Sequence, residues 1–131
     1  MIRKITGIVV SGVCYKESSK IINILTENEG VIGVLAKGCR SYKSKIRVGS
    51  DVLILGCFYL RQYGSSMPLV TEVDIIDTFP NIRTNIMSQS YALLLLELAR
   101  QIVMHEKREN VYSLLISGLK KIDEGCDAEV I

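Results

Sequence analysis

Residues 1–80 consist of short runs that are either continuously apolar or alternate between apolar and polar positions, separated by groups of Gly, Ser, Asn and Glu. Alternation with a period of two is typical of β-strands, and the small polar residues between the runs are typical of turns. The pattern predicts strands over residues 5–13, 20–26, 31–36, 51–63 and 69–76. Short strands joined by such turns indicate a β-sandwich or a small barrel.

The connection over residues 37–47 is polar and has no sustained apolar period. We interpret it as a loop with room for one helical turn. A long connection between the third and fourth strands is a feature of the five-stranded oligonucleotide-binding (OB) barrel. Gly7 and Gly12 lie in the first predicted strand, where a barrel strand bulges or coils sharply. The sequence therefore predicts an OB-type barrel.

The apolar period changes from two to about four after residue 77, which indicates helices. The first helix begins at Pro80 and Asn81, since Pro is tolerated in a first turn and Asn caps free amides, and it runs to about Met104. Its apolar positions are Ile82, Ile86, Leu94, Leu98 and Ile102, with Tyr91, Leu95, Ala99 and Val103 beside them. A second helix over 111–122, ended by Gly125, has as its inward positions Leu114, Leu115, Gly118, Leu119 and Ile122.

Two helices with broad apolar faces cannot bury those faces on the rim of a barrel alone. We therefore expect an OB-fold domain over residues 1–79 and the start of an α-helical domain over 80–131, with the remainder of that domain absent. The expected class is β followed by α.

Positive charge is concentrated in the first part of the chain. The composition, 48% hydrophobic and 23% charged, is that of a folded domain, and a net charge of +2 predicts no partner by itself. Residues 1–47, however, hold nine Lys or Arg against three Asp or Glu, whereas residues 48–80 hold one against four. An anionic partner is expected near the N-terminal cations.

The loop over 37–47 is the strongest functional signal, because it contains cations with no acid between them: Lys37, Arg40, Lys43, Lys45 and Arg47. Such cations neutralise backbone phosphates and release counterions, and Tyr42 inside the run is placed to stack on an exposed base. Lys16 and Lys20 beside the first turn extend this track, and Arg61 is a further DNA-binding candidate. The plain alternative is a surface loop kept basic for solubility.

Metal, redox and membrane roles have no support in the sequence. Cys14, Cys39, Cys57 and Cys126 are far apart, and His105 is the single histidine, so no clustered zinc ligands exist; we expect the cysteines to be small core residues in a reduced cytoplasm. No apolar run approaches the ~20 residues of a membrane span, and the first residues do not contain the long apolar stretch expected of a signal peptide.

Catalysis is also not indicated. His105 lies in a charged connection, where a solvated side chain is the ordinary outcome. The phosphate-binding motif Gly-x-x-x-x-Gly-Lys-Ser/Thr is absent, since Lys37 precedes Gly38. We expect no enzyme activity and no cofactor.

Several segments resemble a known family in the same order along the chain, namely residues 7–10, 15–26, 29–30, 36–40 with 43–44, 72–83 and 91–98. They are similar to the opening of RecO, a family of bacterial recombination mediators. The resemblance implies an N-terminal OB fold followed by a helical domain in a cytoplasmic, nucleoid-associated protein. It also implies that the basic barrel surface contacts DNA, here through Lys37, Arg40, Lys43, Lys45 and Arg47.

The activity implied by the resemblance is the binding of single- and double-stranded DNA and the annealing of complementary strands. With RecR, such a protein helps RecA to displace the single-strand-binding protein. Residues 48–53 lack the Leu-x-Pro-Phe segment common in the family. Relatives also continue with more helices and often a zinc-binding cysteine cluster, so we expect a truncated member in which the contact with the single-strand-binding protein is lost. A docking module of a repair complex and an RNA-binding barrel stay open as alternatives.

Overall fold

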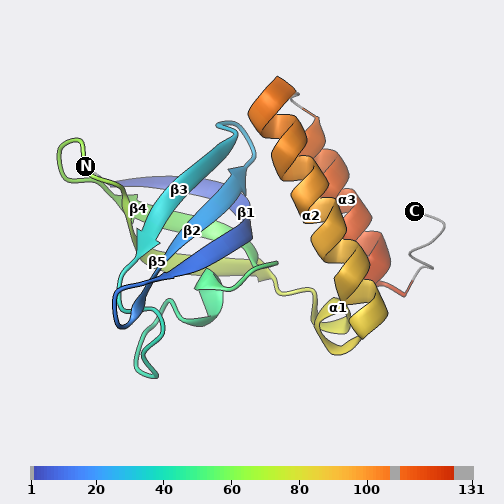
Figure 1. Cartoon of the computed structure of the whole chain (residues 1–131), viewed down its shortest axis with the longest axis horizontal. Coiled ribbons are helices and arrows are strands. Elements are labelled where there is room, and N and C mark those ends of the chain that lie inside the picture. The colour runs from blue at the N-terminus through green and yellow to red at the C-terminus, as the bar shows by residue number, and fades with distance from the viewer. Residues whose placement is uncertain (1, 107–109, 126–131) are drawn as a thin grey trace. The chain divides into compact units, whose positions relative to one another are not determined.

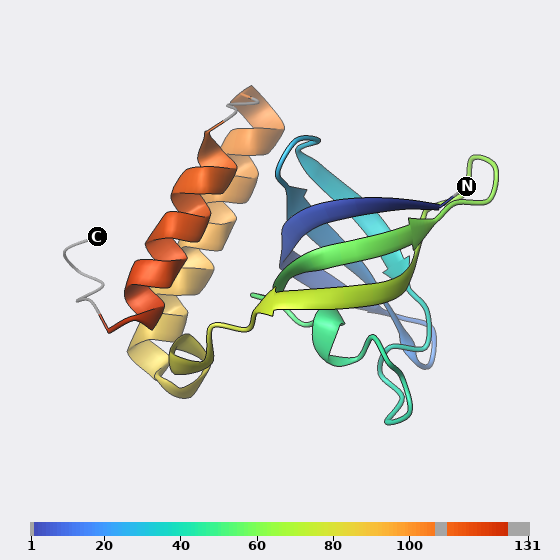
Figure 2. The same cartoon turned by 180° about the vertical axis from the view of Figure 1, so that it is seen from behind.

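The computed structural model describes residues 2–106 and 110–125. Its first part is a closed barrel with the strand order β1-β2-β3-β5-β4 (Figures 1 and 2). The strands are β1 (Ile2–Tyr15), β2 (Ser19–Thr26), β3 (Val31–Ala36), β4 (Leu55–Arg61) and β5 (Leu69–Asp77). The predicted five-stranded OB barrel followed by helices is confirmed.

β1 is long because it pairs with two neighbouring strands in succession. Its first half, up to Ile8, pairs with β4, and its second half, from Gly7, pairs with β2. A bulge between Val9 and Ser11 lies just after this change of partner. A Cβ atom on Gly7 would lie 2.6 Å from the Cγ2 atom of Ile24 and 2.6 Å from a backbone oxygen, so the strand needs glycine where it bends.

The barrel interior is filled by aliphatic side chains around one aromatic ring. Phe58 is fully buried, and the cluster around it includes Ile5, Val9, Ile22, Ile24, Val34, Leu60 and Val70. These residues come from all five strands, so burying them drives closure of the sheet.

The fourth strand is shorter than predicted. The prediction began it at residue 51, but β4 begins at Leu55. Leu53 has a φ of 76°, which breaks the extended chain, and its backbone N–H donates to the oxygen of Val9 (2.9 Å). The short helix η1 (Val48–Ser50) precedes this segment. The apolar run therefore begins in a turn that packs against β1 and only later becomes a strand.

The second part of the chain, from residue 79 onward, forms a separate helical unit. It contains α1 (Pro80–Thr84), α2 (Ile86–Glu106) and α3 (Val111–Asp123). The prediction of one helix from Pro80 to Met104 is wrong, because Asn85 is extended, with φ −123° and ψ 116°. Asn85 then caps α2, since its Oδ1 atom accepts from the Ser88 N–H (3.1 Å).

The cap of α1 comes from the end of α3. The Asp123 Oδ1 atom accepts from the backbone N–H groups of Asn81 (2.9 Å) and Ile82 (3.1 Å), and the Asn81 side chain donates to the Asp123 backbone oxygen (2.8 Å). The prediction that Asn81 itself caps the helix is therefore wrong. Instead, a residue distant in sequence satisfies the free amides and holds α1 against α3.

The buried faces of α2 and α3 differ in part from the predicted ones. α2 buries Ala92, Leu96, Ala99 and Val103, whereas it exposes Ile86, Leu94, Leu98 and Ile102. α3 buries Val111, Leu115, Ile116, Leu119 and Ile122, but Leu114, predicted to face inward, is 65% exposed. α2 therefore carries an exposed apolar face, defined here as Met87, Leu94, Leu98 and Ile102.

The cysteines occupy different environments. Cys39 is buried and Cys57 is half-buried, as expected for small core residues, but Cys14 is exposed at the end of β1, so its predicted core position is wrong. Cys126 lies outside the described residues.

Among the described helices, none combines the length and apolar character that a membrane crossing requires.

Candidate nucleic-acid interface

The basic loop, residues 37–47 between β3 and η1, projects from the barrel near the β1–β2 turn (Figures 1 and 2). Two apolar side chains hold it down, because Cys39 and Ile46 are buried in the barrel core. The Ser50 hydroxyl donates to the Ile46 oxygen (2.7 Å) and fixes the end of the loop. The charged residues between these anchors are therefore presented from a fixed backbone.

Hydrogen bonds join the basic loop to the β1–β2 turn. The Arg40 backbone N–H donates to the Ser18 oxygen (2.9 Å), and its guanidinium donates to the Lys16 oxygen (2.8 Å). The Gly38 N–H donates to the buried Ser19 hydroxyl (2.9 Å). These contacts bring Lys16 next to the loop, although more than twenty positions separate Lys16 from the loop in the sequence.

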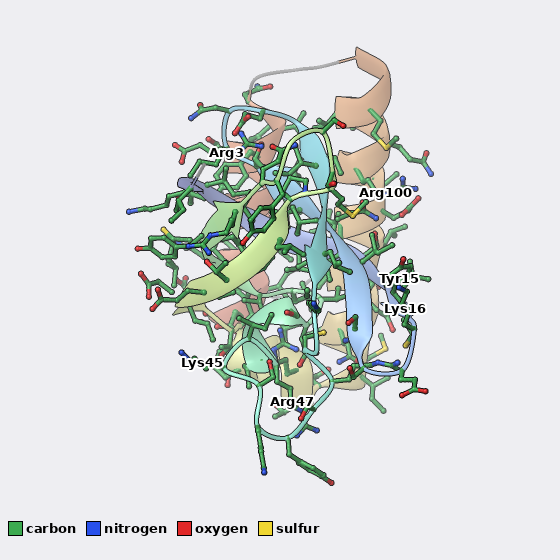
Figure 3. The ribbon with its side chains drawn as sticks, turned by 90° about the vertical axis from the view of Figure 1, so that its left-hand side faces the viewer. Arg3, Tyr15, Lys16, Lys45, Arg47 and Arg100 are labelled. Atoms are coloured by element: carbon green, nitrogen blue, oxygen red, sulfur yellow. The ribbon has the colours of Figure 1, made fainter. Side chains whose placement is uncertain are left out.

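The structure groups six of the predicted cations at this end of the barrel. We call this group the basic face, and its members are Lys16, Lys37, Arg40, Lys43, Lys45 and Arg47. All six are exposed, and within residues 2–106 and 110–125 none of them forms an ion pair with a carboxylate. Figure 3 shows Lys16, Lys45 and Arg47 toward this end and Arg3 toward the other. Free cations of this kind produce a positive field that attracts a polyanion.

Two tyrosines accompany these cations. Tyr42 is 90% exposed, and the Arg47 guanidinium lies 4.8 Å from the centre of its ring. The Lys16 ammonium lies 5.4 Å from the ring centre of Tyr15. A ring supported by a cation offers a stacking surface beside a phosphate-binding charge. Tyr15 was not among the predicted site residues. Its position next to Lys16 in the sequence was the signal that could have identified it.

The remaining predicted cations lie apart from the basic face or are partly neutralised. The Lys20 ammonium lies 3.4 Å from an Asp51 carboxylate oxygen. Arg61 ends β4, and its guanidinium donates to the Tyr63 hydroxyl (3.3 Å). The β4–β5 turn beside it lies away from the basic loop (Figures 1 and 2).

Another surface of the barrel carries carboxylates. β5 exposes Glu72 and Asp74, and the Tyr59 hydroxyl donates to the Asp74 carboxylate (2.8 Å). This hydrogen bond and the negative charge of Asp74 raise the pKa of the Tyr59 hydroxyl. Lys4 lies over the ring of the same Tyr59, 5.8 Å from its centre, so this surface combines both signs of charge, unlike the basic face.

The sequence signals for the structural supports of the basic face were weak. Ser18 and Ser19 lie in the polar stretch between the first two predicted strands, and they bind the loop backbone. Cys39 and Ile46 are isolated apolar residues in a polar run, and their isolation was the only sign that they anchor the loop.

In the described part of the chain, no group of His, Cys, Asp and Glu residues is arranged to hold a metal ion. The side chain of His105 lies outside the described residues.

A closed five-stranded barrel with the strand order β1-β2-β3-β5-β4 and a long connection between β3 and β4 is an OB-fold domain. The family described as "Recombination protein O N terminal" matches residues 1–79, and the chain belongs to this family.

Curated relatives match along the whole chain. The chain is 33% identical to the "DNA repair protein RecO" of Exiguobacterium sibiricum, covering 100% of this chain and 53% of the relative. It is 31% identical to the protein of the same name in Bacillus pumilus and 29% identical to that in Shouchella clausii, each covering 100% of this chain and 51% of the relative. The chain thus spans about half the length of these relatives.

Proposed function

We propose that the chain acts in recombinational DNA repair by binding DNA through the basic face. The observation that carries this proposal is that the six cations of the basic face are exposed and, within the described residues, form no ion pair with a carboxylate; five of them lie on a loop that Cys39 and Ile46 anchor in the barrel core. A preorganised loop loses little conformational entropy on binding, which favours affinity. The family membership and the names of the relatives agree with a role in DNA repair.

The chemistry proposed for the basic face divides between charge and stacking. Lys37, Lys43 and Lys45 neutralise phosphates and displace condensed counterions, so affinity falls as salt rises. Tyr42 stacks on an unpaired base, a contact worth about 1–3 kcal/mol. Duplex DNA keeps its bases stacked internally, so it uses only the charges. We therefore propose single strands as the preferred ligand, with duplex DNA bound more weakly.

The proposal extends to the finer activities implied by the RecO resemblance. Annealing requires two polyanions to approach, and cations at the basic face reduce their repulsion. With RecR, the protein then assists RecA on DNA coated by single-strand-binding protein. This work takes place at the bacterial nucleoid and is binding without catalysis, so it needs no cofactor.

Fluorescence anisotropy with a labelled single strand tests the proposal. The variant replaces Lys37, Lys43 and Lys45 with Glu, leaving the structural contacts of Arg40 intact. The matched control replaces with Glu three exposed lysines distant in sequence, Lys4, Lys120 and Lys121, so both variants have the same net charge. We expect the control to bind almost as the natural chain does. The loop variant should lose at least tenfold in affinity, and its salt slope should fall by about 2, at about 0.7 per single-strand phosphate contact.

Equal binding by both triple variants would contradict the proposal, as would binding with no salt dependence. Tyr42→Leu and Tyr42→Phe separate stacking from charge. We expect Tyr42→Leu to weaken single-strand binding by about tenfold. Tyr42→Phe should bind like the natural chain, since only the ring is needed. Competition with an RNA strand of matched sequence tests the RNA alternative.

The second candidate function is a docking module of a repair complex. The exposed apolar face of α2 favours it, because contiguous apolar side chains on a surface mark interaction sites. Co-elution with RecR on a sizing column, with and without DNA, distinguishes the candidates. Co-elution by a chain that has no DNA affinity would favour docking.

A further inference from the structure

The second half of β1 is a free edge of the barrel sheet. On the β4 side, the last contacts of β1 are made by Val9, whose N–H donates to the Ile54 oxygen (3.0 Å) and whose oxygen accepts from the Leu53 N–H (2.9 Å). Beyond this point, in the part of the chain that the structure describes, only β2 pairs with β1. Residues 11–15 therefore have backbone groups available on one side.

This edge lacks two of the features that normally protect a sheet edge, charge and Pro, although the bulge between Val9 and Ser11 lies at its start. Natural sheet edges carry charged side chains, Pro or covering loops, which block pairing with another chain. Residues 11–15 read Ser-Gly-Val-Cys-Tyr, without charge and without Pro. Val13 in the middle is 62% exposed. The edge is thus open to strand addition.

An apolar row on the outer face of the barrel ends at this edge. Val13 lies opposite Ile21, which lies opposite Leu35, which lies opposite Leu69. Directly opposite residues of paired strands project from the same face of a sheet. Ile21, Leu35 and Leu69 are half-buried, so Val13 is the exposed end of the row. An added strand would continue the row and cover Val13.

We propose that the added strand is the same edge of a second copy of this chain, paired antiparallel about a two-fold axis at Val13. In this register, each small residue faces a larger one: Ser11 faces Tyr15 of the copy, and Gly12 faces Cys14. Val13 faces its own mate. The register uses every free position and stops where Val9 is already bonded.

Charge also favours a second copy. Lys16 at the end of the edge faces Val10 of the copy, so no like charges lie opposite each other across the paired strands. Two-fold pairing repeats each contact, which doubles the effect of a self-complementary edge. The paired segment is short, so the dimer should form in a concentration-dependent manner, as small interfaces do. This inference does not depend on the proposed DNA binding.

Disulfide trapping tests the register. In a chain with Cys14 and Cys126 replaced by Ser, Val13→Cys should form a covalent dimer on mild oxidation without DNA, because opposite Cα atoms in antiparallel strands lie within disulfide range. Tyr15→Cys and Ser11→Cys in the same background should stay monomeric separately and form the mixed dimer together. Equal cross-linking of Val13→Cys and Tyr15→Cys alone would overturn the proposed pairing.

Sedimentation equilibrium tests whether the natural chain dimerises. We expect its average mass to rise with concentration, and Val13→Lys to abolish the rise because two ammonium groups then face each other. Val48→Lys is the matched control: Val48 is exposed on η1, so this variant should dimerise like the natural chain. A natural chain that remains monomeric at every concentration, or equal association of the two lysine variants, would overturn the proposal.

Discussion

In the barrel, the ring of Phe58 is 0% exposed, whereas on α2 the side chain of Leu94 is 55% exposed. Both residues lie in strongly apolar stretches of sequence. The difference arises from topology. A closed sheet surrounds its interior with strands that all contribute to one core, but α2 packs against α1 and α3 and leaves another apolar face uncovered. An apolar pattern therefore predicts the element without showing whether the element has a partner.

The comparison also separates the two candidate functions. In the barrel, the proposed binding surface is an anchored polar connection, the basic loop. The helical unit presents apolar side chains directly. Charge acts over several ångströms and attracts polyanions, whereas an apolar surface contributes only when another surface covers it. The proposed DNA contact therefore lies on the barrel and the docking alternative on α2.

The largest predicted effect is the loss of a buried aromatic side chain from the barrel core. It is compared with the loss of an exposed leucine side chain from α2. Phe58→Ala leaves a cavity in the barrel core and should lower the free energy of unfolding of the barrel by about 3–5 kcal/mol. Leu98→Ala removes an exposed side chain from a helix that accepts Ala well, so the change should stay within about 0.5 kcal/mol.

Urea denaturation, followed by circular dichroism for the whole chain and by Tyr fluorescence, measures both variants. A loss of about 2 kcal/mol or more from Leu98→Ala would mean that the α2 face is covered in solution. That result would break the contrast between the two units.

A smaller effect is expected at the polar contact that organises the helical unit. Asp123→Ala removes the acceptor for the Asn81 and Ile82 amides and should destabilise the unit by about 1–2 kcal/mol. Asp123→Asn keeps an acceptor oxygen and should lose less than half as much. Hydrogen exchange at the two amides gives a local measurement. If Asp123→Ala left their protection unchanged, α1 would be held by packing alone.

The barrel was largely predictable because its strands are short apolar or alternating runs and each turn has its own Gly or Ser. The start of β4 was not, since Val52, Leu53 and Ile54 continue the apolar run although Leu53 adopts a positive φ. Asn85 likewise interrupts a helix whose apolar period runs through it. Local pattern predicts the type of an element better than its ends.

The charges of the candidate site were visible in the sequence, but its architecture was not. A run of cations between two strands shows that the connection is polar. It does not show where the barrel places that connection. That Arg40 binds the backbone of Lys16, or that Lys20 lies beside Asp51, depends on which segments the fold brings together. The assignment of these cations to DNA stays a prediction until binding is measured.

The smallest predicted effect concerns charge on the exposed surface of α2. Hydrogen bonds from Arg100 and then from Gln101 lower the pKa of the Glu97 carboxyl from its usual 4.5 to about 2. A carboxyl whose pKa is lower in the folded state stabilises that state above its unfolded pKa. This contribution is lost as pH falls from about 4.5 through about 2. Because the pair is exposed, salt should weaken it, and its effect on unfolding should be small.

NMR titration of the Glu97 side chain measures this pKa directly. We expect a midpoint near 2 in low salt, shifting toward 4.5 in high salt or in Arg100→Gln. A Glu97 midpoint near 4.5 in low salt would show that Arg100 does not hold the carboxylate in solution. The α2 surface would then be ordered by its apolar contacts alone, which sharpens its contrast with the hydrogen-bonded loop of the barrel.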